Sequence, residues 1–179
     1  MNKPRPRRLG HLVLKVRDLE RSTRFYTEIV GLTISDRIGD RMVFLRAASD
    51  HHDLALAQLP PGEAAAPAGQ GPGLEHFSYY IPDFAEIEQA VEFLKAKGIP
   101  VVRGPGKHGP GENTFLVFKD PDGNNVEFYS DMRQIDAERP YEPSVWPDAV
   151  ETLDVWRLSR WAVEPPEWLK KKYGLKEPG

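Results

Sequence analysis

The chain has 179 residues, of which 40% are hydrophobic and 28% are charged, so it is long and apolar enough to bury a globular core. Its formal net charge is only -3, from 24 basic and 27 acidic residues, which gives no electrostatic footprint for nucleic acid. No apolar run approaches the roughly 18 residues of a membrane span, and no apolar stretch follows the basic N-terminus as a secretory signal requires. We therefore expect a cytoplasmic protein that binds neither nucleic acid nor membranes.

The sequence contains no cysteine and five histidines. The lack of cysteine excludes disulfides, thiolate catalysis and zinc sites of the cysteine type. A metal ion in this chain must therefore be held by histidine and carboxylate side chains.

Residues 9–59 have the pattern of a βαβββ module. A β-prone run follows His11, and Asp18 is a suitable N-cap for the amphipathic helix behind it, since its carboxylate can accept first-turn N–H groups. Gly31 is placed to end that helix, because glycine readily adopts the left-handed conformation found there. Three extended segments follow, at residues 32–38, 42–47 and 54–59.

Residues 74–130 repeat this pattern after a linker, residues 60–73, that is rich in Pro, Gly and Ala. His76, Asp83 and Gly98 take the places of His11, Asp18 and Gly31. The remaining predicted features of the second module are strands at 99–103, 114–118 and 126–129, a glycine-rich loop at 104–111 and a turn at 120–124.

Residues 131–179 depart from the repeat and contain all four tryptophans. Leu153, Trp156, Leu158 and Trp161 predict a short helix, and Pro165-Pro166 can begin another. The simpler interpretation is a tail that packs over the modules, and the alternative is that its aromatic residues close an active site or form a subunit contact. The sequence thus predicts an α+β fold of two βαβββ modules, followed by an aromatic-rich C-terminal tail with short helices.

Three residues could form a metal site. His11 and His76 occupy equivalent positions of the two modules, and Glu127 lies in a strand with period-2 alternation. A lone strand histidine is usually structural and a lone glutamate usually faces solvent, but the matched positions favour convergence. Two imidazoles and one carboxylate leave open metal positions, an arrangement typical of non-haem Fe(II) oxygen chemistry.

These residues lie in motifs that resemble a known family. Gly10-His11-Leu12-Val13-Leu14, Leu74-Glu75-His76-Phe77-Ser78 and Asp120-Pro121-Asp122-Gly123-Asn124-Asn125-Val126-Glu127 resemble the vicinal-oxygen-chelate superfamily, which includes glyoxalases, bleomycin resistance proteins and extradiol dioxygenases. The resemblance is greatest to the extradiol catechol dioxygenases. It implies a glyoxalase-like fold in which His11, His76 and Glu127 bind Fe(II), with Mn(II) as the alternative.

The resemblance also implies roles for further residues. His52, in His52-Asp53-Leu54, matches the family's acid/base histidine, whereas His51 is interpreted as its solvated neighbour unless the register is shifted by one. His108, in the glycine-rich loop, matches a histidine that would donate a hydrogen bond to substrate. The family's tyrosine is replaced by Val117, so the substrate-binding residues are expected among three other tyrosines: Tyr79, Tyr80 and Tyr129.

The implied function is that of a homo-oligomeric extradiol dioxygenase of aromatic catabolism, which cleaves a catechol-type ring with O₂. Alternatives are a glyoxalase, an epimerase or a fosfomycin-type transferase of the same fold, or a metal-free binding module. Glyoxalases and epimerases of the superfamily use a second acid from the first module, but Leu56 is expected opposite Glu127, with Ala57 and Gln58 beside it. Retention of three metal ligands disfavours the binding module.

Overall fold

The computed structural model describes residues 7–63, 73–157 and 167–173. They form two compact units: residues up to Glu75 together with Asp120–Asn124, and His76–Lys119 together with the remainder from Asn125 onward. Each unit contains one four-stranded sheet. Within the described ranges, no helix is both long enough and apolar enough to cross a bilayer.

The first unit has the predicted βαβββ order. Its sheet has the strand order β1-β4-β3-β2, with β1 parallel to β4 and the other neighbours antiparallel. Its elements are β1 (Leu12–Val16), α1 (Leu19–Glu28), β2 (Thr33–Ile38), β3 (Met42–Arg46) and β4 (Leu54–Gln58).

Local signals at both ends of α1 act as the sequence predicts. The Asp18 carboxylate accepts a hydrogen bond from the Arg21 backbone N–H at 2.9 Å, and Gly31 has a φ of +88° that few other residues adopt. The helix contacts β3 and β4, and one face of the sheet is apolar. The buried residues of that core include Leu14, Val16, Val43, Leu45, Leu54 and Leu56.

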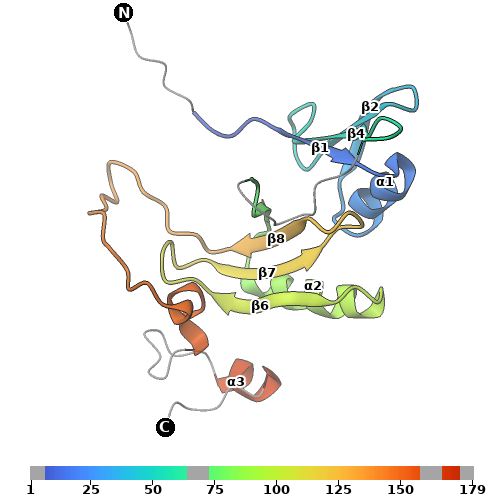
Figure 1. The fold of residues 1–179 in the computed structure, drawn as a ribbon. Coiled ribbons are helices and arrows are strands. Elements are labelled where there is room, and N and C mark those ends of the chain that lie inside the picture. Colours follow the sequence, from blue (N-terminus) through green and yellow to red (C-terminus); the bar gives the residue numbers. More distant parts are fainter. Residues whose placement is uncertain (1–6, 64–72, 158–166, 174–179) are drawn as a thin grey trace, which may run out of the picture. The chain divides into compact units, whose positions relative to one another are not determined.

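The second unit repeats this topology. The strand order is β5-β8-β7-β6, and β5 runs parallel to β8 as β1 does to β4. Figure 1 shows β8, β7 and β6 side by side. The elements are β5 (His76–Tyr80), α2 (Phe84–Ala96), β6 (Val101–Lys107), β7 (Thr114–Lys119) and β8 (Asn125–Ser130). The prediction of a duplicated βαβββ module is therefore confirmed.

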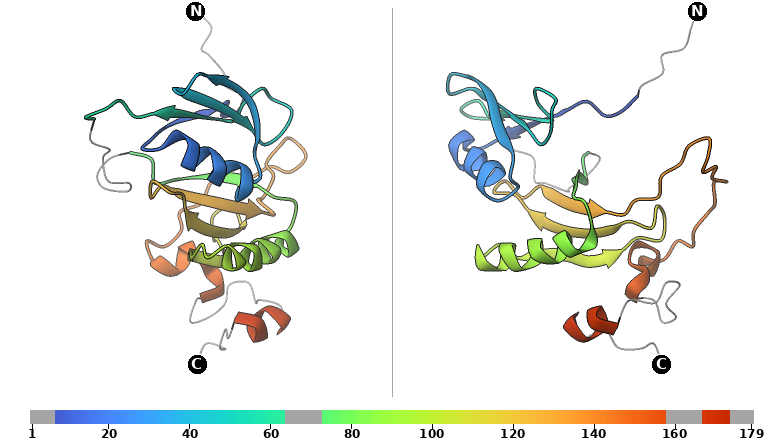
Figure 2. Two further views of the ribbon diagram at one scale, coloured as in Figure 1. Left: turned by 90° about the vertical axis from the view of Figure 1, so that its right-hand side faces the viewer. Right: turned by 180° about the vertical axis from the view of Figure 1, so that it is seen from behind.

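Helix α2 covers one face of the second sheet. It contacts β6, β7 and β8, and it lies along the sheet in both views of Figure 2. Ile87 and Leu94 of the helix are fully buried, as is Phe118 of β7. Because side chains alternate along a strand, residues of the opposite parity point to the face away from α2. That second face carries His76, Ser78 and Glu127.

The glycine-rich segment differs from its prediction as a loop. Strand β6 continues through Gly104-Pro105-Gly106 to Lys107, and its pairing with β7 has register shifts at Val101/Arg103 and Arg103/Gly106. Glycine and proline are disfavoured in regular strands, but they are found at such bulges. The loop is therefore shorter and begins at His108.

The tail forms η1 (Val150–Leu153), η2 (Val155–Arg157) and α3 (Glu167–Tyr173). The helix predicted around Leu153 and Trp156 is thus two short 3₁₀ turns, while Leu158 and Trp161 lie outside the described residues. Helix α3 directly follows Pro165-Pro166, as predicted. Trp156 is buried, and its ring meets that of Phe84 edge-to-face at 5.2 Å between centroids.

Candidate functional site

Glu127 lies at the centre of the second sheet, on the face away from α2. Its strand neighbours in register are Ser78 of β5 and Val117 of β7. The residue is 3% exposed, and the Ser78 hydroxyl donates a hydrogen bond to Oε1 at 2.9 Å. The carboxylate is therefore held in a fixed orientation by a residue from the adjacent parallel strand.

The second oxygen of Glu127 faces two imidazoles. Oε2 is 3.6 Å from His76 Nε2 and 3.8 Å from His108 Nε2. It is buried and has no hydrogen-bond partner among the described residues. Burial raises the pKa of the Glu127 carboxyl, but the approach of His108, the Ser78 hydrogen bond and the charge of His76 together hold that pKa below its usual value. The group is therefore an anionic donor with one oxygen unused.

His108 follows β6 directly and is held on two sides. Its ring stacks on Phe115 with 4.0 Å between centroids and 5° between planes. Its Nδ1 lies 2.6 Å from the backbone carbonyl of Leu153, in the C-terminal tail. These contacts leave Nε2 directed toward Glu127.

The other histidines belong to the first unit, where Phe44 lies beside two of them. The ring of His52 lies 4.7 Å from that of His11 and 5.1 Å from that of Phe44, between centroids. His51 is an exposed neighbour of His52, as interpreted from the sequence, and its Nδ1 is 3.0 Å from Nδ1 of His52 while its Nε2 is 2.9 Å from the Asp36 carboxylate. The structure thus links Asp36, His51 and His52 in a hydrogen-bonded chain.

The three candidate tyrosines separate by strand parity. Tyr80 and Tyr129 lie on the face of Glu127, with ring centroids 5.7 Å apart. They line a hollow of about 520 Å³ whose other lining residues are Pro82, Asp131, Met132 and Gln134. Tyr79 has the opposite parity and lies beside Phe77, at 6.0 Å between ring centroids, on the helix-covered face. Its position therefore does not suit it to contact a ligand at Glu127.

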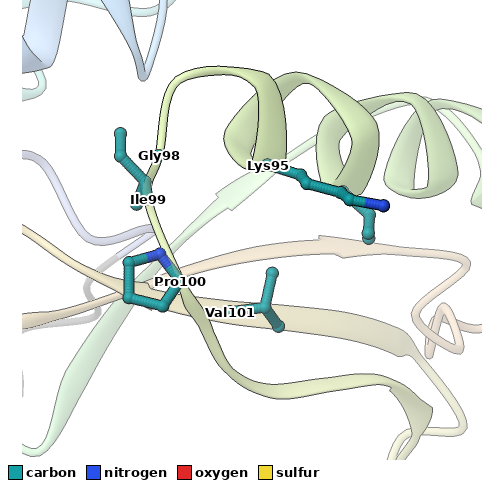
Figure 3. A pocket seen from close by; sticks show the side chains of 6 residues that line it. Lys95, Gly98, Ile99, Pro100 and Val101 are labelled. Atoms are coloured by element: carbon teal, nitrogen blue, oxygen red, sulfur yellow. The ribbon is translucent and has the colours of Figure 1, made fainter.

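A second hollow, of about 460 Å³, lies between the end of α2 and the start of β6. Figure 3 shows Gly98, Ile99, Pro100 and Val101 along its wall, with the Lys95 side chain extending from the helix. Its lining is mainly apolar and includes no residue of the Glu127 cluster. We therefore do not assign the chemistry to this hollow.

The donor set of the second unit fits part of a metal site. Two donors of one ion, each about 2.0–2.2 Å from it, can be as far apart as the Glu127 and His76 atoms are. The unused anionic oxygen beside them is the kind of group that a divalent cation satisfies. Within the described ranges, however, no three His, Cys, Asp or Glu side chains form a ready-made metal cage. His11 belongs to the first unit, where its ring lies beside that of His52.

The strand registers correct the predicted equivalence of the two modules. Val13, two residues after His11, pairs with Ala55, just as Ser78 pairs with Glu127. The counterpart of Glu127 is therefore Ala55 rather than Leu56. By the same registers Phe44 is the counterpart of Val117. Neither Ala55 nor Leu56 is acidic, so the first module still offers no second carboxylate there.

The sequence analysis did not identify two groups that contribute to the site, the Ser78 hydroxyl and the Leu153 carbonyl. Ser78 could have been found, because it lies two residues after His76 and period-2 alternation places both on one face. The Leu153 carbonyl has no such signal, since a backbone group carries no residue-type information.

Comparisons with known proteins agree with this fold. The sequence model of the Glyoxalase/Bleomycin resistance protein/Dioxygenase superfamily matches residues 8–128, and the chain belongs to that superfamily. It is 30% identical over 165 residues to metapyrocatechase 2 of Cupriavidus necator, which covers 91% of this chain and 47% of that protein. It is 31% identical over 182 residues to the manganese-dependent 2,3-dihydroxybiphenyl 1,2-dioxygenase of Geobacillus genomosp. 3, covering 94% and 54%.

The fold also resembles that of an enzyme whose name is not that of a dioxygenase. The crystal structure of lactoylglutathione lyase from Agrobacterium tumefaciens superposes with a TM-score of 0.54 at 27% identity, covering 72% of this chain and 96% of that one. The chain spans about half the length of the two dioxygenases that it matches.

Proposed function

We propose that this chain is a metal-dependent extradiol dioxygenase that cleaves the ring of a catechol-type aromatic with O₂. The carrying observation is the buried Glu127 carboxylate. One of its oxygens is held by Ser78, and the other lies near the imidazoles of His76 and His108 without a hydrogen-bond partner among the described residues. The relatives named metapyrocatechase 2 and manganese-dependent 2,3-dihydroxybiphenyl 1,2-dioxygenase support this assignment.

In this proposal His11, His76 and Glu127 hold one Fe(II) or Mn(II) ion. A bound ion would supply Lewis acidity toward the substrate. His11 and His76 would supply two imidazole nitrogens and Glu127 the single carboxylate, a set that suits a divalent ion. Ser78 orients the carboxylate, as residues behind metal ligands generally do.

In this proposal a histidine transfers the protons. His52 removes and returns substrate protons, a role in general acid/base catalysis that histidine fills more often than any other residue. Its link through His51 to Asp36 orients the ring. His108 contacts the substrate oxygens from the other module. Tyr80 and Tyr129 provide the aromatic wall of the hollow beside Glu127 and bind the remainder of the substrate.

A glyoxalase reaction is the main alternative, because a lactoylglutathione lyase shares the fold. The superfamily resemblance implies that such enzymes need a second acid from the first module. The counterpart of Glu127 is Ala55, a residue without a proton-transferring group. This observation favours the dioxygenase.

The proposal is tested with protein purified without oxygen. Metal content is measured first, and oxygen uptake is then followed with a panel of catechols, with a glutathione hemithioacetal as the alternative substrate. We expect about one iron or manganese per chain, and oxygen uptake that coincides with a yellow ring-opened product. Metal-loaded protein that isomerises the hemithioacetal and consumes no oxygen with any catechol would contradict it.

A further inference from the structure

The hollow beside Glu127 carries a negative charge. Asp131 is the one charged side chain among the described residues that line it. Arg133 is close in sequence but does not line the hollow. Its guanidinium pairs with the Glu112 carboxylate and lies 5.6 Å from the centroid of the Tyr141 ring. The hollow therefore attracts a cationic ligand and repels an anionic one.

The Asp131 carboxylate is fixed by buried groups at the end of β8. The Ser130 hydroxyl donates to its Oδ2 at 2.7 Å, and the Thr114 hydroxyl lies 2.5 Å from that of Ser130. Both hydroxyl residues are buried. Asp131 itself has a φ of +59°, a left-handed conformation that aspartate adopts more readily than most residues. The charge is thus held in place by its own backbone and by neighbours on two strands.

Two aromatic rings line the same hollow. Tyr80 and Tyr129 have ring centroids 5.7 Å apart, and their planes are tilted by 58°. The face of an aromatic ring is electron-rich and attracts a cation that lies over it. Two tyrosines beside one carboxylate are the groups that recognise an organic ammonium ion, because they combine ion pairing with cation–π contacts. Met132 and Pro82 supply apolar surface beside them.

We propose that this hollow binds an alkylammonium group, and that the substrate class is a catechol with a short ammonium-bearing arm. Tyr129 lies two residues from Glu127 on one face of β8, which corresponds to about 7 Å along the strand. An aromatic ring with a short arm spans such a distance. The substrate class rests on the proposed function, whereas the binding of ammonium does not.

The test uses three probes of similar size in the full-length chain: 2-phenylethylammonium, 2-phenylethanol and 3-phenylpropanoate. They have no catechol oxygens, so they cannot chelate a metal ion, and an alkyl amine stays protonated at neutral pH as lysine does. Ligand-observed NMR titrations give the three dissociation constants. We expect the ammonium to bind most tightly and the carboxylate most weakly, with a difference that shrinks as salt is added.

Asp131→Asn removes the charge with little other change. Asparagine keeps an oxygen that accepts from Ser130, and it also tolerates a positive φ. The affinity for the ammonium should fall by about 1.5- to 5-fold, as for an exposed ion pair, and that for the carboxylate should rise by a similar factor. Asp40→Asn, at an exposed turn of the first unit, is the matched control and should leave all three affinities unchanged.

Two further variants locate the bound cation. Tyr80→Ala should lower the affinity for the ammonium by about 2- to 5-fold, the effect of an exposed cation–π contact, and Tyr80→Phe should retain most of it. Glu127→Gln should keep the preference for ammonium. A preference that disappears in Glu127→Gln and persists in Asp131→Asn would overturn the proposal, as would equal affinities for the three probes. Circular dichroism establishes that each variant is folded.

Oxygen uptake with two catechols, one with a 2-aminoethyl arm and one with a 2-carboxyethyl arm, separates the two proposals. We expect a higher kcat/KM for the amine. If neither catechol is consumed while the probes keep their order of affinity, the dioxygenase assignment fails and the ammonium site stands. If both catechols are consumed equally well and the probes bind equally, the dioxygenase assignment stands and the ammonium site is refuted.

Discussion

The two modules share their topology and differ on the sheet face that is not covered by their helix. In the first module, the ring of His52 lies between those of His11 and Phe44 in ring contact with both, and Ala55 occupies the central position of the neighbouring strand. In the second, that central position is Glu127, whose Oε2 lies 3.6 Å from His76 Nε2 and 3.8 Å from His108 Nε2. Duplication therefore preserved the histidine that opens each module, while the carboxylate occurs at the matched position of the second alone. The anionic donor of the proposed metal set therefore comes from the second module.

We expect the largest effect from removing the negative charge of Glu127, which has no counterpart at the matched position of the first module. Glu127→Gln keeps the size of the side chain and an oxygen acceptor for Ser78, but it removes the only anionic donor of the proposed set. We expect metal affinity to fall by more than the 10–100-fold typical of residues that merely support a ligand. Metal content after dialysis measures this loss.

The matched control is Glu63→Gln, which removes a half-exposed carboxylate paired with Lys15 in the first unit. It should bind metal as the unmodified protein does. Equal metal affinity in Glu127→Gln and Glu63→Gln would exclude Glu127 as the anionic metal ligand.

The next largest effect concerns the first module. His52→Ala and His52→Phe should retain the metal and lower kcat by about 10²–10⁴-fold, the usual contribution of general acid/base catalysis. His51→Ala should lower kcat by no more than about 10-fold, since it removes one hydrogen bond that orients His52 in an exposed setting. Steady-state oxygen uptake measures both values. A larger loss for His51 than for His52 would exchange their roles.

The fold could be predicted from sequence because its signals are local. Asp18, Asp83, Gly31 and Gly98 bound the two helices through caps and positive φ values that depend on a few neighbouring residues. The βαβββ repeat then followed from matched spacing. The same repeat led to the expectation that His11, His76 and Glu127 converge, and the structure places His76 and Glu127 near each other.

What could not be predicted depends on contacts distant in sequence. The Leu153 carbonyl meets His108 across 45 residues, and no residue type encodes a backbone acceptor. The continuation of β6 through Gly104-Pro105-Gly106 contradicts local propensity, because it depends on pairing with β7 and on bulges. The misplaced counterpart of Glu127 arose from unequal loops, which only the strand registers resolve.

An intermediate effect should come from Ser78, whose counterpart in the first module is Val13. Ser78→Ala removes the hydrogen bond that holds Oε1 of Glu127 and leaves the carboxylate charge in place. We expect metal affinity to fall by about 10–100-fold, as for other partners behind a metal ligand. Ser78→Thr keeps the hydroxyl and suits a strand, so it should restore most of the affinity. Titration with Mn(II) followed by electron paramagnetic resonance compares the three proteins, and equal binding would show that the hydrogen bond does not position the carboxylate.

The smallest effect concerns one position in β1 and its counterpart in β5. In each strand it is the last residue whose side chain points away from the helix. Four positions after the opening histidine, the first module has Lys15, paired with Glu63 at 3.1 Å, and the second has Tyr80, beside Tyr129 and the hollow next to Glu127. If that hollow holds the substrate, Tyr80→Ala should raise KM for a catechol by about 2- to 12-fold with little change in kcat, which corresponds to the 0.5–1.5 kcal/mol typical of an aromatic contact.

Tyr80→Phe keeps the ring and should behave like the unmodified enzyme, since its hydroxyl makes only a long contact of 3.4 Å to the Pro82 carbonyl. Lys15→Ala removes an exposed ion pair, which contributes little free energy, and should leave KM unchanged. A KM that rises equally in Tyr80→Ala and Lys15→Ala would indicate a general loss of packing. A KM that responds to neither substitution would show that the substrate does not bind in the hollow beside Glu127. Tyr80 and Tyr129 would then have no role in binding, and the catechol would have to be bound by the residues around Glu127 alone.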